Sequence, residues 1–388
     1  MSDSKKETVF LTGSTGFLGS HIGSELLRKG ETVYFLVRAD NRRSGSDRLN
    51  QMLDWHGINP KAKRNARVIE GGLDDPGMGM DPSQRGQAGS RITRIIHCAS
   101  DTSFSERKRR QVWKANVESL EELMDFAAQS KCQRFIHLST AYAAGRRSGI
   151  CREEFVKEKE FFNVYEESKA AAENYLESRC CEENIRLTII RPSIVYGDSR
   201  TGRTLRFNAL YYPVKAALFL KKIYREDILK HGGKKAAAAG VKIKSNGAVQ
   251  LPLRIAVNDN GGVNLIPIDF LVNAFFAVTE NPDSEGIFHI VNSRLTQIKD
   301  IITFACRQFK LEGIRPCSPE DLKNNPRNSL ERLYERYLEA YIPYMRDTRI
   351  FSAEKTAPLL EREGIACPEF SEILFRRCMA YADKQGWS

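Results

Sequence analysis

Two pairs of residues in this chain have the types and spacing needed for acid–base chemistry. Tyr165 precedes Lys169 by four residues, and Tyr211 precedes Lys215 by the same interval. In a helix, side chains four residues apart lie on one face, one turn from each other. A lysine ammonium beside a phenol favours the phenolate and lowers the pKa of the tyrosine, which would make it an acid or base near neutral pH. Because this spacing also arises by chance, the surrounding elements must distinguish the two pairs.

Those elements alternate along the first half of the chain. Short apolar runs that end in glycine or polar residues are typical of buried strands, and here they are ETVFLTG, TVYFLVR, ARVIEGGL, RITRIIHCAS, CQRFIHLSTAY and IRLTIIRPSIVYG. Helical patterns lie between them, such as RRQVWKANVESLEELMDFAAQS. Strands that alternate with helices predict an α/β fold, a doubly wound parallel sheet with helices on both faces.

A glycine-rich loop, TGSTGFLGS, joins the first strand to the first helix. In that context the first glycine allows a tight turn, the second lets the backbone approach a pyrophosphate, and the third lets helix and strand pack closely. The helix N-terminus also favours negative charge. We therefore predict a Rossmann-type dinucleotide site, with a purely structural turn as the alternative. Its residues are Gly13, Ser14, Thr15, Gly16, Phe17, Leu18 and Gly19.

The end of the second strand indicates which dinucleotide is bound. A carboxylate there would bind the ribose 2′-hydroxyl of NAD, whereas an arginine suits the 2′-phosphate of NADP. Arg38 stands at this position, and Arg48 follows nearby. The sequence thus predicts NADPH as the cofactor, with NAD as the less favoured alternative because Asp40 is close by.

Sequence context also separates the two tyrosines. The pair Tyr211–Lys215 encloses Pro213, which spoils a regular turn unless a helix starts there. Tyr165 begins a helix 25 residues after Thr140, the end of the fifth strand. Since the carboxyl ends of strands line the ligand crevice of a doubly wound sheet, we expect Thr140, Tyr165 and Lys169 to converge beside the nicotinamide.

In this order, T-G-x-x-G-x-x-G, S-T-A-Y and Y-x-x-x-K resemble the extended short-chain dehydrogenases/reductases over residues 7–292. The resemblance implies that Tyr165 is the general acid/base and that Thr140 hydrogen-bonds the substrate oxygen. It implies that Lys169 lowers the pKa of the tyrosine and binds the nicotinamide ribose. Further implied cofactor contacts are Arg48, Leu73, Cys98, Ala99, Ser100, Asn116, Pro192 and Ile194, although Asn116 could instead support its helix.

One departure from this family's pattern follows the third strand. Where many relatives have Gly-Asp-Leu, this chain has Gly71, Gly72 and Leu73. The resemblance therefore implies that the adenine contact is lost or moves to Asp74 or Asp75.

Several short segments are similar to the acyl-thioester reductase branch, namely FLVRA, IIHCASDTSFSE, STAYAAG and NLIPIDFLVNAFFAV. This likeness implies reduction of an acyl-CoA or acyl carrier protein thioester by NADPH to an aldehyde, with or without a second reduction to the alcohol. A sugar-nucleotide epimerase, dehydratase or reductase is the alternative within the enzymes. A non-catalytic NADP-binding regulator is the alternative outside them.

These patterns predict two parts of the chain. The NADP-binding domain spans residues 1–200, with returning segments at about 262–292 that include the strand GIFHIVN. Residues 201–261 and 293–388 would form a smaller, mainly helical substrate-binding and C-terminal region. In it, 205–230 has a helical pattern and 231–247 is expected to be an exposed loop. Four apolar residues of the helix could line an acyl channel or pack a core: Leu210, Val214, Leu218 and Leu220.

The formal net charge of +11 is concentrated in residues 200–258. This basic segment has only Glu226 and Asp227 against Arg200, Arg203, Arg206, Lys215, Lys221, Lys222, Arg225, Lys230, Lys234, Lys235, Lys242, Lys244 and Arg254. Such a surface attracts CoA phosphates, an acidic carrier protein or an anionic membrane surface; a merely solvated face is the alternative. No nucleic-acid-binding motif accompanies it.

Apolar runs, the N-terminal segment and the cysteines indicate the cellular compartment. No apolar run approaches the ~18 residues of a membrane-spanning helix, and MSDSKKETVFLTG has no signal-peptide hydrophobic region. Nine cysteines show no zinc-ligand spacing, so no metal is expected. Reduced thiols and the absence of a signal predict a cytoplasmic protein.

Overall fold

The computed structural model describes residues 7–157, 159–258 and 262–387. The chain forms two compact units that interleave in sequence. The sheet unit comprises the described residues of Met1–Ser193 together with Phe270–Ile290 and Phe351–Ala366. The second unit comprises those of Ile194–Asp269 together with Val291–Ile350 and Cys367–Ser388.

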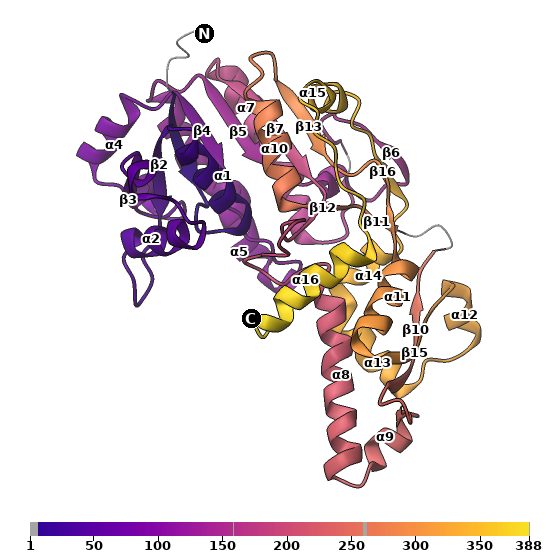
Figure 1. Ribbon diagram of the computed structural model, residues 1–388. Coiled ribbons are helices and arrows are strands. Elements are labelled where there is room, and N and C mark those ends of the chain that lie inside the picture. Colours follow the sequence, from indigo (N-terminus) through magenta and orange to yellow (C-terminus); the bar gives the residue numbers. More distant parts are fainter. Residues whose placement is uncertain (1–6, 158, 259–261, 388) are drawn as a thin grey trace. The chain divides into compact units, whose positions relative to one another are not determined.

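The sheet unit is built on a parallel sheet that has seven strands among the described residues, in the order β13-β7-β5-β4-β1-β2-β3 (Figure 1). The strands are β1 (Thr8–Thr12), β2 (Thr32–Val37), β3 (Ala66–Glu70), β4 (Arg94–His97), β5 (Arg134–Leu138), β7 (Arg186–Pro192) and β13 (Gly286–Ile290). The predicted doubly wound α/β fold is confirmed. The strand order reverses between β1 and β4, which is where such sheets bind ligands, at the carboxyl ends of the strands.

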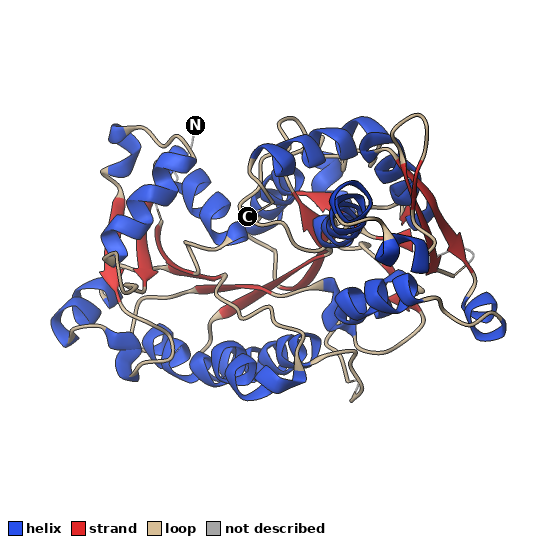
Figure 2. Ribbon diagram, turned by 90° about the horizontal axis from the view of Figure 1, so that it is seen from below, coloured by secondary structure: helices blue, strands red, loops and turns tan. Residues whose placement is uncertain are grey.

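Helices cover both faces of this sheet (Figure 2). The α-helices of this unit among the described residues are α1 (Phe17–Arg28), α2 (Gly45–Trp55), α3 (Pro60–Lys63), α4 (Pro82–Gly89), α5 (Arg109–Trp113), α6 (Ser119–Ala128), α7 (Val164–Glu182), α10 (Ile268–Thr279) and α15 (Ala357–Arg362). Alternate residues of a strand point to opposite faces. Phe10 of β1 accordingly packs with Leu123 of α6 and Leu176 of α7. Its neighbour Leu11 faces Gly23 of α1, where an added Cβ would lie 2.8 Å from the Leu11 side chain.

A buried polar cluster ties the segment Phe351–Ala366 to the rest of the sheet unit. The carboxylate of Glu153 accepts from the Thr356 hydroxyl at 2.5 Å and from the backbone N–H of His289 at 2.8 Å. Beside it, Arg191 and Glu173 form an ion pair in which both side chains are fully buried. A buried charge is tolerated only when it is paired, so this pair is a structural element of the sheet unit.

The second unit is a mixed α/β assembly. Its strands are β8 (Ile194–Tyr196), β9 (Lys242–Ile243), β10 (Val249–Ala256), β11 (Gly262–Val263), β12 (Leu265–Pro267), β14 (Thr296–Gln297) and β15 (Leu311–Cys317). Its helices are α8 (Tyr211–Lys230), α9 (Lys234–Ala238), α11 (Ile298–Phe309), α12 (Pro319–Asn324), α13 (Ser329–Leu338), α14 (Ile342–Met345) and α16 (Glu372–Lys384). The strand β15 pairs in parallel with β10, and β9 pairs antiparallel with it.

Two local expectations for this unit were wrong. The segment 231–247 is not simply an exposed loop, because it contains α9 and β9, and Ala236 is fully buried in an apolar core with Val249 and Leu251. The segment LEGIRPC is a strand within a region expected to be helical. Its strand conformation depends on pairing with β10, a partner far away in sequence, rather than on a local apolar alternation.

Candidate active site

The glycine loop has the backbone geometry expected of a dinucleotide cradle. Gly13 adopts φ of 72°, and a Cβ there would lie 2.5 Å from the backbone nitrogen of Ala99. A Cβ at Gly19 would lie 2.3 Å from the carbonyl oxygen of Gly13. The helix α1 starts after Gly16, which has no side chain to cap the first turn. The Ser14 hydroxyl is buried and has no hydrogen-bond partner among the described residues. Open backbone donors and an unused hydroxyl at a helix N-terminus suit a bound pyrophosphate.

The end of β4 lies directly beside this loop. Thr12 Oγ1 is 2.8 Å from His97 Nδ1 and accepts from the backbone N–H of Ala99 at 3.4 Å. The predicted cofactor residues Cys98 and Ala99 are thereby brought against Gly13, since both lie close to the position of an added Cβ there. Two strand ends that meet at the switch point form the crevice that the topology requires.

Asn116 joins the β4 loop to α7. It lies in a π-helical stretch, Lys114–Glu118, between α5 and α6, and its side chain is buried. Its Oδ1 accepts from the Ser100 hydroxyl and from the backbone N–H of Asp101. Its Nδ2 donates to the Asp101 carbonyl and to the Ser168 hydroxyl, each at 2.9 Å. These bonds use both ends of the amide, which favours the supporting role over a cofactor contact.

Thr140 and Tyr165 meet at the carboxyl end of β5. Thr140 is buried and caps the short helix Ala141–Ala144 by accepting from the Tyr142 N–H at 3.3 Å. Tyr165 lies in the first turn of α7, which Asn163 caps by accepting from the Glu166 N–H at 3.0 Å. The Thr140 hydroxyl lies close enough to the Tyr165 phenol to lower the pKa of that phenol through hydrogen bonding. Burial, and then the Glu166 charge, raises the pKa of Tyr165. The phenol therefore remains protonated at neutral pH, as a proton donor requires.

Lys169 lies one turn further along α7 but directs its ammonium to the sheet. Its Nζ donates to the Leu138 carbonyl at 2.6 Å and lies 3.1 Å from His137 Nε2. Burial lowers the pKa of Lys169 to about 8, partly offset by the Glu173 charge. The spacing alone led us to expect a lowered tyrosine pKa. The structure shows a raised one, because burial of the phenol dominates and Lys169 is bound to β5.

The second tyrosine–lysine pair has a structural role in the second unit. The helix α8 begins at Tyr211, so Pro213 falls in its first turn, where proline is tolerated. The buried Tyr211 hydroxyl accepts from the Gly197 N–H at 3.1 Å. Lys215 donates to the Trp387 carbonyl at 2.6 Å. Both side chains are thus used in holding the second unit together.

The end of β2 carries a network of arginines and acids. Asp40 pairs with Arg43 at 2.6 Å and with Arg48 at 3.5 Å, and the hydrogen bond from Arg43, then that from the Arg42 backbone, lowers the pKa of Asp40. Arg48 also donates to the Arg38 carbonyl and, at 3.5 Å, to Thr15 of the glycine loop. Asp40 is therefore already engaged by arginines.

Arg38 itself is 65% exposed and pairs with Asp74 at 3.3 Å. Asp74 is one of the two acids expected to replace the usual aspartate after β3. A Cβ at Gly72 would lie 2.7 Å from Asp75 Oδ2, so a side chain at position 72 would have to displace this carboxylate. Leu73 packs in the sheet unit's core. Pro192 ends β7, and Ile194 starts β8 two residues later.

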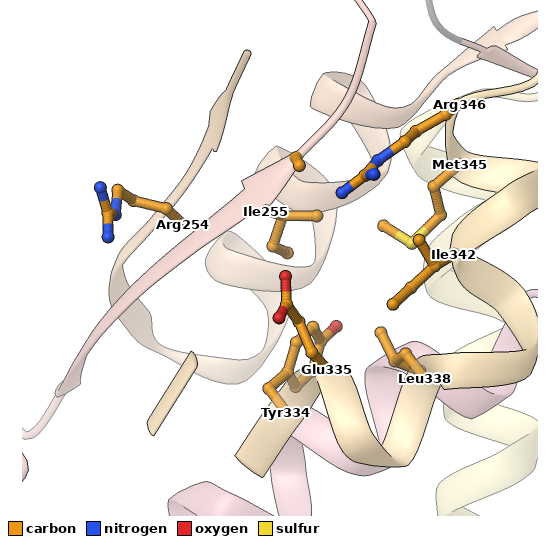
Figure 3. Close-up of a pocket in the computed structure, with 9 residues that line it drawn as sticks. Arg254, Ile255, Tyr334, Glu335, Leu338, Ile342, Met345 and Arg346 are labelled. Atoms are coloured by element: carbon orange, nitrogen blue, oxygen red, sulfur yellow. The ribbon is translucent and has the colours of Figure 1, made fainter. Parts of the chain in front are cut away.

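The four apolar residues weighed for an acyl channel pack in cores of the second unit. Leu210 and Val214 are buried with Tyr196 and Phe375, Leu218 packs against that cluster, and Leu220 is fully buried in another. A small cavity in this unit lies between β10, α13 and α14, lined by Ile255, Leu338, Ile342 and Met345 among others (Figure 3). Its volume is about 20 Å³, enough for about one water molecule. We assign it no substrate role.

The basic segment is partly neutralised by acids from elsewhere in the second unit. Arg254 pairs with Glu331 at 2.7 Å and lies 3.9 Å from Asp321. Lys221 donates to the Phe309 carbonyl at 2.6 Å. Lys222 and Arg225 of α8 are exposed. Among the residues that the structure describes, no helix is both long and apolar enough to cross a bilayer.

Known proteins are similar to this chain in sequence and in fold. A family model described as Male sterility protein matches residues 11–275. A linear gramicidin synthase of Brevibacillus parabrevis is 24% identical over 99% of this chain, which spans 7% of that protein. The fatty acyl-CoA reductase wat of Drosophila melanogaster is 25% identical over 70% of this chain and 54% of its own length.

Solved structures agree on the fold. The terminal R domain of a myxalamid PKS-NRPS pathway superposes with a TM-score of 0.77 at 20% identity, covering 100% of this chain and 92% of its own. A thiolation-reductase di-domain from an archaeal non-ribosomal peptide synthetase gives a TM-score of 0.72 at 18% identity, covering 99% and 76% respectively. The family model matches more than half of the length of this chain. The chain therefore belongs to that family, an NAD(P)-binding family of extended short-chain dehydrogenases/reductases.

Proposed function

We propose that this chain reduces an acyl thioester, carried on CoA or on an acyl carrier protein, with NADPH as the cofactor. The observation that carries the proposal is that the buried Thr140 hydroxyl lies beside the Tyr165 phenol at the end of β5, in a sheet whose glycine loop fits a dinucleotide. Relatives named as fatty acyl-CoA reductases support the substrate class.

The side chains of Thr140 and Tyr165 suit this reaction. The bound dinucleotide would supply a hydride to the thioester carbonyl carbon. Thr140 and Tyr165 would donate hydrogen bonds to the carbonyl oxygen and stabilise the negative charge that develops there. Tyr165 would then give its proton to that oxygen, which its raised pKa allows. Loss of the thiol from the resulting thiohemiacetal leaves an aldehyde, and a second round would give the alcohol.

NADPH is preferred over NADH because of the charges at the end of β2. Arg38 is exposed there, and a guanidinium can bind a 2′-phosphate through charged hydrogen bonds. Asp40, which would otherwise favour a free ribose hydroxyl, is held by Arg43. The pairing of Arg38 with Asp74 must loosen or rearrange for a phosphate to be bound.

The carrier would dock on α8. Phe219, Ile223 and Leu229 of this helix are exposed by 45%, 38% and 61%, and the exposed cations Lys222 and Arg225 lie beside them along the helix. CoA and acyl carrier proteins are anionic, so this mixture of apolar and basic side chains complements either of them. An anionic membrane surface is the competing partner for the same face.

The deciding experiment measures NADPH oxidation with acyl-CoA, with acyl carrier protein thioesters and with a panel of UDP- and GDP-sugars. We expect oxidation and free thiol release with the thioesters alone. Turnover of a sugar nucleotide would instead support the epimerase, dehydratase or reductase alternative. Tight NADPH binding without turnover of any substrate would indicate a non-catalytic regulator.

A further inference from the structure

Lys169 is a fully buried cation that is held by a strand rather than by an acid. Two of its contacts come from consecutive residues of β5, the Leu138 carbonyl at 2.6 Å and His137 Nε2 at 3.1 Å. An ammonium has three N–H donors and accepts nothing. His137 Nε2 must therefore be the acceptor, which places the imidazole proton on Nδ1.

We propose that His137 is a positioning residue that holds the Lys169 ammonium at the carboxyl end of β5 by accepting one of its three hydrogen bonds. The Leu138 carbonyl accepts the second. The third donor is then left for a ligand, and this part of the inference rests on the proposed function.

The surroundings of His137 suit an acceptor that must stay neutral. Its ring stacks on that of His97, its register partner on β4, with centroids 5.2 Å apart and planes at 14°. Both rings are buried. Burial, then the Lys169 charge, lowers the pKa of His137 well below its usual value, and the same two causes lower the pKa of His97 to about 3. A neutral imidazole stabilises the ammonium without adding a second positive charge.

The other groups that face Lys169 do not replace this acceptor. Cys98, after β4, and Glu173 on α7 both raise its pKa. The Cys98 thiol is held neutral because burial raises its own pKa to about 12. The carboxylate of Glu173 is paired with the buried Arg191. Tyr165, one turn earlier on α7, is kept protonated by burial.

Removing the acceptor should therefore destabilise the charged form of Lys169. Burial already lowers the pKa of Lys169 to about 8. Without His137 Nε2, the charged form loses a hydrogen bond that the neutral amine does not need. The pKa of Lys169 should fall further, and the positive charge should be lost at a lower pH.

The test is a titration of the full-length protein labelled with [ε-¹³C]lysine and followed by NMR, with neither cofactor nor substrate present. The Lys169 signal is the one that disappears in Lys169→Arg. We expect His137→Leu to lower its titration midpoint by roughly one pH unit, the scale of one charged hydrogen bond. His137→Gln, whose side-chain amide can place an acceptor near the Nε2 position, should restore most of the shift.

Two further variants keep the result interpretable. His137→Phe keeps a ring to stack on His97 but has no acceptor, so it replaces His137→Leu if that variant does not fold, with the same downward shift expected. His289→Leu removes another buried histidine, on β13, that contacts the Ser352 carbonyl and the Arg191 guanidinium but not Lys169, and it should leave the Lys169 midpoint unchanged. Equal midpoints in wild type, His137→Leu and His137→Phe would overturn the proposal, as would an equal shift in His289→Leu. If thioester reduction fails while this titration behaves as expected, only the proposed function is lost.

Discussion

The Thr140 hydroxyl lies close enough to the Tyr165 phenol to lower the pKa of that phenol through hydrogen bonding, although 25 residues separate the two in the chain. One hydroxyl follows the end of β5, and the other lies in the first turn of α7. This proximity turns two residues of ordinary type into a site with two adjacent hydroxyl groups. Its neighbour Lys169, which the spacing suggested would act on the phenol, instead binds the strand that ends beside them.

Tyr165→Phe should lower turnover of a thioester by ~10²-fold or more, because it removes the proposed proton donor. NADPH binding, followed by fluorescence, should be retained. Tyr211→Phe is the matched control, since it removes the same atom from a tyrosine whose hydroxyl accepts from Gly197. If both variants lost turnover equally, the assignment of Tyr165 would be incorrect.

Arg38→Asp should weaken NADPH binding by roughly 1.5–3 kcal/mol, the value of a hydrogen bond between charged groups, while NADH binding should change much less. Arg42→Asp makes the same change of charge four residues away and serves as the control. Fluorescence titration of both cofactors with both variants measures the effect. If Arg38→Asp left NADPH affinity unchanged and Arg42→Asp lowered it, the phosphate contact would be assigned to Arg42 instead.

The rate should depend on the charge of Lys169. Because burial lowers the pKa of Lys169 to about 8, the ammonium is present below this pH and is lost as the pH rises through it. We therefore expect kcat/KM for the thioester to fall on the alkaline side of about pH 8. Lys169→Arg stays charged throughout this range, so any activity that it retains should lack this alkaline limb. The same limb in both proteins would assign the titration to another group.

Reversing Lys222 and Arg225 to Glu should raise KM for the carrier-bound substrate, and salt should raise KM in the wild type, because exposed charges are screened over about 8–10 Å. Lys221 is left unchanged, since it donates to the Phe309 carbonyl. Turnover of a small uncharged thioester should remain nearly constant.

The control for the docking prediction is the same charge reversal at Lys61 and Arg64, two exposed cations of the sheet unit. It should leave KM for the carrier unchanged. A loss of activity on both substrates in the α8 variant would make the helix structural. The absence of any effect would mean that its charges are merely solvated. Co-sedimentation with anionic vesicles that depends on Lys222 and Arg225 would favour the membrane partner.

Arg191→Leu should destabilise the protein by about 3–5 kcal/mol, since it leaves the carboxylate of Glu173 buried without its partner. The control is Arg152→Leu, which removes one member of an exposed pair with Glu354 at 3.1 Å. Exposed pairs contribute about 0–1 kcal/mol. Urea unfolding of both variants measures the difference, and similar midpoints for the two would show that the buried pair is not needed for stability.

The sheet and the glycine loop could be predicted from the amino-acid sequence, because both depend on local chemistry. Apolar runs of strand length, separated by helical patterns, specify parallel strands with little help from distant residues. The glycines of the loop are required by positive φ at Gly13 and by backbone contact at Gly19. The convergence of Thr140 with Tyr165 followed from the rule that strand ends share one edge of the sheet.

The partners of long side chains and weak strands could not be predicted in this way, because they are set by the folded chain. Lys169 could reach Tyr165 or the end of β5, and the buried acceptors Leu138 and His137 bind it. The segment LEGIRPC has no strand pattern of its own and becomes β15 by pairing with β10. Arg254 belongs to a strongly basic segment, yet Glu331 neutralises it across 77 residues of chain. In each case the partner is distant in sequence, so the free energy of the contact is absent from any local pattern.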